Sequence, residues 1–268
     1  MTLHQLQNAK ILDQFTKQAE PYAKLTGINR GDGASPSSSF IDALAPFATD
    51  CVLDVACGVG RLTLMLAKLT RHVTGIDLTA AMIDQGRVLQ AEGGMTNVDW
   101  RVGDILPLPF PDGAFSLVVS QAAFHHLADP AAALAEMLRV CSPGGRIAIN
   151  DMSPEPDKAE ALNRVEKLRD PSHVRALPPA ELRALGKHAE LVEIAVSSYR
   201  VSKIPLEAVL ATSFPMPGDL EKVRGMYRSD AQSGADTFGL RTEFSADQIT
   251  IQYPMTFIVW QRSAPGAV

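Results

Sequence analysis

The sequence predicts a doubly wound α/β fold with a mostly parallel, seven-stranded sheet. Three observations lead to this prediction. Short runs rich in β-branched residues alternate with helical segments along the chain. These runs are bounded by Gly, Pro or Asp, which is typical of buried parallel strands. Repeated strand and helix units require right-handed crossovers, and such crossovers produce a doubly wound sheet.

The expected helices lie between the expected strands. "GRLTLMLAKL" follows the first strand, "AAMIDQGRVLQ" follows the second with Thr79 as its N-cap, and "AAALAEMLRV" follows the fourth. One more helix is expected near 179–189. The expected strands cover residues 51–56, 72–77, 98–102, 115–120, 145–151, about 191–201 and about 249–260.

The chain is expected to divide into three parts. Its 268 residues, 46% of them hydrophobic, suit one large domain with a modest cap. Residues 1–39 are expected to form a lid helix and a hinge loop at 31–39, and residues 40–152 a ligand-binding core. Residues 153–268 complete the core and carry a cap insert at about 205–239. The alternative for this insert is a surface helix pair without a ligand role.

Composition excludes several classes of partner. A formal net charge of −5 disfavours nucleic acid, because phosphate neutralisation needs clustered Lys and Arg. No stretch approaches the ~20 apolar residues of a membrane span, and the first twenty residues lack a secretory apolar run. Cys51, Cys57 and Cys141 are odd in number and lack C-x-x-C spacing, which indicates reduced thiols. We therefore expect a cytoplasmic protein, monomeric or homodimeric, without a nucleic-acid or membrane partner.

A glycine loop and three acids follow the first three strands. In "VLDVACGVGRL" a strand delivers Asp54, and the chain turns through Gly58 and Gly60 into a helix. Asp77 closes the second strand, where a carboxylate can accept both hydroxyls of a ribose, and Asp104 follows the third. These strand ends converge on the crevice where parallel sheets bind ligands. The pattern predicts an adenosine ligand with a tail.

A dinucleotide is the competing ligand for this loop. The G-x-G-x-x-G fingerprint needs a third small residue, but Thr63 stands there. Asp54 would repel a pyrophosphate, whereas it suits an ammonium group. These features favour a nucleoside with an amino-acid tail.

Taken together, these segments resemble class I S-adenosylmethionine-dependent methyltransferases. The resemblance is to the small-molecule branch related to ubiquinone/menaquinone C-methyltransferases and natural-product O-methyltransferases, methyltransferase type 11. It rests on "VLDVACGVG", "VTGIDLTAAMIDQGR" and the run from "GDILPLPF" to "CSPGGRI", within about residues 12–152. It implies a Rossmann-like core, S-adenosyl-L-methionine as cofactor, S-adenosyl-L-homocysteine as product and a small-molecule substrate.

The resemblance also implies roles for individual residues. It places Asp54, Ala56, Gly58 and Gly60 around the methionine part, and Gln121 near the sulfonium end. The residues implied at the ribose, at the adenine or elsewhere along the cofactor are Asp77, Leu78, Met82, Asp104 and Ile105.

The chain departs from the family's pattern in one place and avoids another. Ser116 stands where an acid often begins the fourth strand, a position that is usually structural. "SQAAF" stands where nucleic-acid amino methylases carry an Asn/Asp-Pro-Pro-aromatic run, which weighs against that chemistry.

Two adjacent histidines, His125 and His126, follow the fourth strand. Adjacent side chains point in different directions, so at most one faces the pocket. Asp151 ends the neighbouring fifth strand, ~4.8 Å away in a parallel sheet, so its carboxylate can reach a histidine. The resemblance implies the first histidine of such a doublet, and we expect His125 as general base oriented by Asp151. The alternatives are ordinary packing or a metal site that includes Asp129.

The substrate side is predicted from scattered residues. Tyr22, His126 and Met216 are expected to contact the substrate. Tyr22 lies at a helical spacing that also suits a core position, and packing beneath the loop is the favoured alternative for His126. "KLRDPSHVR" (167–175) offers cations to an acidic acceptor, or forms a solvated charged turn. No metal site is expected.

The sequence is compatible with three different functions. The expected one is methyl transfer to a small molecule, with O- or C-methylation favoured. A nicotinamide oxidoreductase would bind NAD preferentially. A non-catalytic scaffold would bind S-adenosylmethionine without transferring the methyl group.

Overall fold

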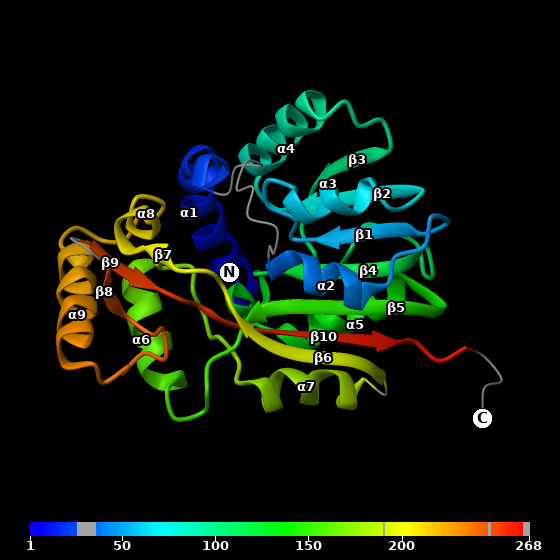
Figure 1. The fold of residues 1–268 in the computed structure, drawn as a ribbon. Helices are drawn as coiled ribbons and strands as arrows, with labels where there is room; N and C mark the ends of the chain where they lie inside the picture. Colours follow the sequence, from blue (N-terminus) through cyan, green and yellow to red (C-terminus); the bar gives the residue numbers. More distant parts are fainter. Residues whose placement is uncertain (26–35, 190, 246–247, 265–268) are drawn as a thin grey trace.

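A seven-stranded sheet forms the centre of the molecule (Figure 1). The computed structural model describes residues 1–25, 36–189, 191–245 and 248–264. The strand order is β3-β2-β1-β4-β5-β10-β6, and only β10 runs antiparallel to its neighbours. The strands are β1 (Cys51–Val55), β2 (His72–Asp77), β3 (Val98–Val102), β4 (Phe115–Gln121), β5 (Cys141–Met152), β6 (Val192–Arg200) and β10 (Pro254–Gln261). The predicted fold class is confirmed.

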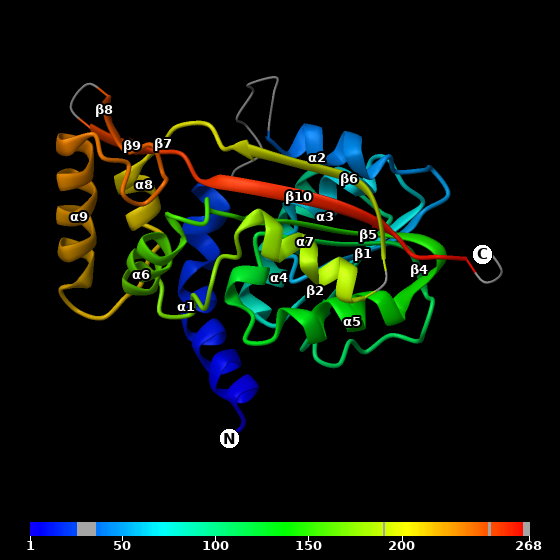
Figure 2. The same cartoon turned by 90° about the horizontal axis from the view of Figure 1, so that it is seen from below.

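Helices cover both faces of this sheet (Figure 2). Successive side chains of a strand point to opposite faces, so Val52 packs against α2 (Pro36–Leu44) and α3 (Arg61–Ala67), while Leu53 packs on the side of α5 (Pro130–Val140) and α7 (Pro179–His188). α4 (Ala80–Glu92) contacts β2 and β3. Two apolar layers therefore hold the strand ends in fixed positions.

The last predicted strand is two strands, not one. β9 (Gln248–Ile251) pairs with β7 (Ile204–Pro205) and β8 (Glu243–Ser245) in a separate small sheet. β10, which belongs to the main sheet, begins at Pro254. Proline has no N–H to donate to a ladder and is tolerated as the first residue of a strand. The single expected strand at 249–260 is therefore corrected.

Two helical parts lie beside the sheet. α1 (Leu3–Leu25) contacts α4 and passes between the sheet and the cap (Figure 1). α8 (Leu206–Leu210) and α9 (Asp219–Ser233) pack with α6 (Ala159–Arg169) in a second apolar cluster. Most of the hinge loop expected at 31–39 lies outside the described residues. Within the described ranges, no helix has both the length and the apolar character needed to cross a membrane.

Candidate active site

The glycine loop turns sharply where β1 ends. Ala56, Gly58 and Gly60 all have positive φ, at 55°, 54° and 74°. An alanine in this region carries a strain of order 1 kcal/mol, and such strain clusters at functional sites. The carboxylate of Asp77 holds the loop, because Gly58 N donates to Oδ2 at 2.8 Å and Thr79 N donates to Oδ1 at 2.8 Å.

Asp54 lies buried behind this loop. Thr63 Oγ1 donates to Asp54 Oδ2 at 2.6 Å. Burial raises the pKa of Asp54 to about 7 against the opposing effect of the Thr63 hydrogen bonds, and the nearby charge of Asp77 raises it further. Burial likewise raises the pKa of Asp77. Two buried carboxyl groups with raised pKa values favour a ligand that brings positive charge or hydrogen-bond donors.

The third acid is held by the first helix. Asp104 Oδ2 lies 2.7 Å from His4 Nε2 and accepts from Asn8 Nδ2 at 2.7 Å, while Oδ1 accepts from Leu106 N at 3.0 Å. The Asp104 side chain keeps 35% of its surface exposed. His4 and Asn8 could not be predicted from the sequence, since nothing local indicates a partner about 100 residues away.

The remaining residues that the resemblance implied at the cofactor lie in different surroundings. Ile105 belongs to the apolar core, and Met82 is buried against Ala19 and Val59. Leu78 is half-buried after β2. Gln121 ends β4 half-buried, and its buried Oε1 has no hydrogen-bond partner among the residues that the structure describes.

Asp151 holds the turn that carries His125 and His126, which is called the histidine turn below. The chain leaves β4 through Ala122 at φ 54° and forms the 3-10 turn η1 (Phe124–His126). Asp151 Oδ2 accepts from Ala123 N at 2.9 Å and from Phe124 N at 2.7 Å. Asp151 Oδ1 lies 2.6 Å from His125 Nδ1, so this nitrogen carries the hydrogen. In the described part of the chain His125 Nε2 has no hydrogen-bond partner.

The pKa values of the adjacent His125 and His126 are shifted in opposite directions. Burial lowers the pKa of His125, but the charge and hydrogen bond of Asp151 outweigh burial and raise it above 6.5. Burial and the neighbouring His125 lower the pKa of His126 to about 4. His126 is packed in the interior, with Ser172 Oγ 3.1 Å from its Nδ1 and the ring of Phe15 edge-on at 5.0 Å.

The metal alternative finds no support in these contacts. His125, His126 and Asp129 have separate partners, since Asp129 caps α5 by accepting from Ala132 N. Among the described residues, no group of three His, Cys, Asp or Glu side chains is placed to hold a metal ion.

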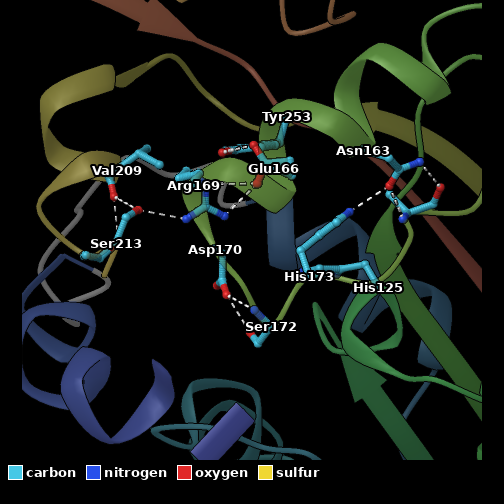
Figure 3. A network of polar contacts seen from close by, with 12 residues as sticks. His125, Asn163, Glu166, Arg169, Asp170, Ser172, His173, Val209, Ser213 and Tyr253 are labelled. Carbon is cyan, nitrogen blue, oxygen red and sulfur yellow. Dashed lines mark hydrogen bonds and ion pairs between the residues drawn. The ribbon is translucent and has the colours of Figure 1, made fainter. Parts of the chain in front are cut away.

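The segment 167–175 is not a solvated turn (Figure 3). His173 is buried, with its ring centroid 5.5 Å from that of His125 and its Nε2 2.7 Å from Asn163 Oδ1. Arg169 donates to Glu166 through Nε and Nη2, at 2.9 and 2.6 Å, and to Ser213 Oγ at 3.0 Å. The solvated-turn expectation is wrong for His173 and Arg169. It holds for Arg175, which is exposed and pairs with Glu181.

The two other expected substrate contacts fall in different places. Tyr22 packs with Phe15, Ala19, Val59 and Met82 beside the glycine loop, which is the core position that its spacing also allowed.

Met216, expected to contact the substrate, is 67% exposed and points to solvent. Its insert uses Leu206, Val209 and Leu210 for its own core with α6. The contact of Met216 with a substrate stays a prediction.

Comparisons with known proteins agree with this fold. The order of the strands and the acid-lined glycine loop define the class I methyltransferase fold. Residues 53–149 match a family model described as a methyltransferase domain. The uncharacterized methyltransferase YcgJ of Bacillus subtilis is 35% identical over 173 residues, which are 64% of this chain and 67% of that protein. The chain belongs to this methyltransferase family.

Structure and further relatives extend the comparison. The crystal structure of YcgJ superimposes with a TM-score of 0.72 at 25% identity, over 84% of this chain and 97% of that one. The ubiquinone/menaquinone C-methyltransferase of Roseobacter denitrificans is 35% identical over 45% of this chain and 50% of its own length. A probable tocopherol O-methyltransferase of Oryza sativa is 36% identical over 42% of this chain and 35% of its own length. The matched segments thus span half or less of these last two relatives.

Proposed function

We propose that this chain transfers a methyl group from S-adenosyl-L-methionine to a small molecule, by O- or C-methylation. The observation that carries the proposal is the 2.6 Å contact between His125 Nδ1 and Asp151, with Nε2 left unengaged. Asp54 and Asp77 end neighbouring strands of the same sheet and lie beside the glycine loop. The base His125 and the acidic site for a positively charged cofactor would then face the same crevice.

The residues present fit the cofactor. The buried Asp54 carboxyl, with a pKa of about 7, would accept the ammonium group of the methionine part. Each oxygen of Asp77 still has a lone pair for a ribose hydroxyl beyond the backbone N–H it accepts. A Cβ built on Gly58 meets nothing within 4 Å, so the loop is open on that side. When bound, the cofactor supplies an electrophilic methyl group on a sulfonium.

The chain's own contribution is to position and deprotonate the acceptor. Holding the nucleophile in line at ~3 to 3.5 Å from the methyl carbon supplies most of the acceleration. His125 Nε2 takes the proton of the acceptor, and Asp151 orients the ring and stabilises its protonated form. Such a general base adds roughly 10² to 10⁴-fold.

A small-molecule acceptor is supported by the relatives and by the base. The two relatives above are named for ubiquinone or menaquinone C-methylation and for tocopherol O-methylation. Hydroxyl and enolisable carbon acceptors both lose a proton during methylation, so both need a base of the kind His125 offers.

The proposal is tested by following a labelled methyl group. The purified protein is incubated with methyl-labelled S-adenosylmethionine and a size-fractionated cell extract. We expect label in a low-molecular-weight product. Cofactor binding without any labelled product would favour the scaffold function, and preferential binding of NAD would favour an oxidoreductase.

A further inference from the structure

Three glycines from three elements make room for one tryptophan. Trp100 lies on the edge strand β3, where it pairs in register with Gly75 of β2. A Cβ built on Gly60, Gly75 or Gly86 would lie 2.1, 2.8 or 2.9 Å from a carbon of the Trp100 ring. Carbon atoms do not approach so closely, so any side chain at these positions would displace the indole.

The indole is fixed in this slot by Gln90. Trp100 Nε1 donates to Gln90 Oε1 at 2.6 Å. The amide nitrogen of Gln90 donates to Met95 O at 3.0 Å and to Val98 O at 3.2 Å. With both ends of its amide engaged, Gln90 holds one orientation and holds the indole in one position.

This contact separates the roles of the two glycines of the loop. A Cβ on Gly58 would meet nothing, so Gly58 faces open space, whereas Gly60 gives its side-chain space to Trp100. Cys57 Sγ lies 3.0 Å from the Cβ position of Gly75, so it reaches the same slot. Gly60 therefore rests on the indole, while the loop is open at Gly58.

We infer that Trp100 is a positioning residue for the cofactor loop. This inference rests on the proposed function of the loop. The indole holds residues 57–60 in the conformation in which Cys57 N donates to Ile76 O and Gly58 N donates to Asp77 Oδ2. Without the indole the loop samples other conformations, and the cofactor must order it on binding. That ordering lowers affinity without removing any contact to the cofactor.

The test is the substitution Trp100→Phe, which removes the part of the ring that fills the slot and keeps an aromatic residue in β3. The matched control is Trp260→Phe, because a Cβ on Gly186 would lie 2.2 Å from Trp260 Nε1, the same kind of contact at another part of the sheet. Two quantities are measured. One is the Kd for S-adenosylhomocysteine by calorimetry, and the other is amide hydrogen exchange over residues 54–62 in the unliganded protein.

We expect Trp100→Phe to weaken binding on the order of tenfold and to speed exchange over 54–62. Trp260→Phe should change neither, even where it lowers the Tm. Gln90→Leu removes the indole's acceptor together with the donor to Met95 O and Val98 O, and keeps the indole itself, so it should shift both quantities in the same direction by less. Adding Gly86→Ala to Trp100→Phe refills part of the slot and should recover part of the affinity.

Each arm has an outcome that overturns the inference. Unchanged affinity and exchange in Trp100→Phe would overturn it, and so would equal losses in Trp260→Phe. If the wild-type protein does not bind S-adenosylhomocysteine, the proposed function fails, while the exchange arm still decides whether the indole orders the loop.

Discussion

Asp54 carries a pKa of about 7 in the folded protein against an ordinary value of 3.8. Between these values the folded state keeps the proton and the unfolded state has lost it. This carboxyl group therefore contributes stability at low pH that is lost as pH rises from about 4 to about 7. A positively charged ligand, as proposed for this site, would offset this cost at neutral pH.

Asp54→Asn should therefore stabilise the unliganded protein at pH 8. The asparagine oxygen keeps the hydrogen bond from Thr63 and has no charge to bury. We expect a gain of roughly 2 to 4 kcal/mol in the free energy of unfolding, at about 1.4 kcal/mol per tenfold change in proton affinity. Cofactor affinity should fall at the same time. Denaturant unfolding at pH 5 and pH 8 measures the gain, and a less stable variant at pH 8 would contradict the burial argument.

His125 should impose a pH dependence on turnover. The base is the neutral imidazole, and Asp151 raises the pKa of His125 above 6.5, so turnover should rise with pH through that raised value. Asp151→Asn removes the charge, so the inflection should move to lower pH and the maximal rate should fall. The measurement is kcat against pH for both proteins. An inflection that does not move in the variant would remove Asp151 from this role.

The proximity of His125 and Asp151 could be deduced from sequence, because His125 follows the end of β4 and Asp151 lies near the end of the neighbouring parallel strand β5. The partners of Asp104 and His173 could not. His4 and Asn163 reach them from α1 and α6, and no local pattern encodes such contacts.

At the scale of elements, α1 is attached largely by side-chain amides. Gln7 Nε2 donates to His126 O at 2.8 Å and to Ser172 O at 2.6 Å. Gln14 Nε2 donates to Phe214 O at 2.9 Å, and Gln18 Nε2 to Asp170 Oδ2 at 3.2 Å. One helix thus bonds to the histidine turn, the segment after α6 and the cap.

Gln7→Leu tests this attachment. The substitution leaves two buried carbonyl oxygens without a donor, so the free energy of unfolding should fall by about 1 to 3 kcal/mol. Gln5→Ala is the matched control on the exposed side of the same helix and should change it by less than about 0.5 kcal/mol. Urea denaturation measures both. Equal effects of the two substitutions would show that the Gln7 contacts add nothing.

Elements were predictable where side-chain periodicity was clean. β2 and β3 have the predicted bounds because apolar residues and Gly or Asp boundaries mark them. No helix was predicted over the residues of α6, because its buried face includes the polar residues Asn163 and Glu166, which interrupt the apolar repeat. Some of their partners, such as His173 and Tyr227, lie outside α6, so only the folded chain shows why polar residues stand there.

At the scale of the whole molecule, the cap has a core separate from that of the sheet. Its apolar cluster includes Val209, Val223 and Tyr227, and it encloses a polar centre at Glu166. The hydroxyls of Tyr227 and Tyr253 each donate to Glu166 Oε1 at 3.1 Å, and Arg169 donates to Oε2. The sequence predicted the insert but not its centre, because these residues lie far apart along the chain.

Glu166→Ala should destabilise this cap strongly. It leaves the buried guanidinium of Arg169 without its partner, which costs about 3 to 5 kcal/mol. The double variant Glu166→Met, Arg169→Met should recover the part of the loss that comes from the unpaired charge of Arg169, because an apolar pair needs no charge partner. The hydroxyls of Tyr227 and Tyr253 lose their acceptor in both variants. Thermal unfolding with hydrogen exchange over 204–240 measures both effects. A double variant as unstable as Glu166→Ala would contradict this account of the ion pair.

General-base catalysis by His125 is tested by the rate of label transfer from S-adenosylmethionine to the isolated product. This rate is compared between the wild-type protein and His125→Ala at saturating cofactor. His72→Ala, at the start of β2, serves as the control histidine. A general base at His125 predicts a fall of roughly 10² to 10⁴-fold in His125→Ala, with unchanged Kd for S-adenosylhomocysteine and unchanged transfer in His72→Ala. Transfer by His125→Ala at the wild-type rate would show that His125 is not the general base.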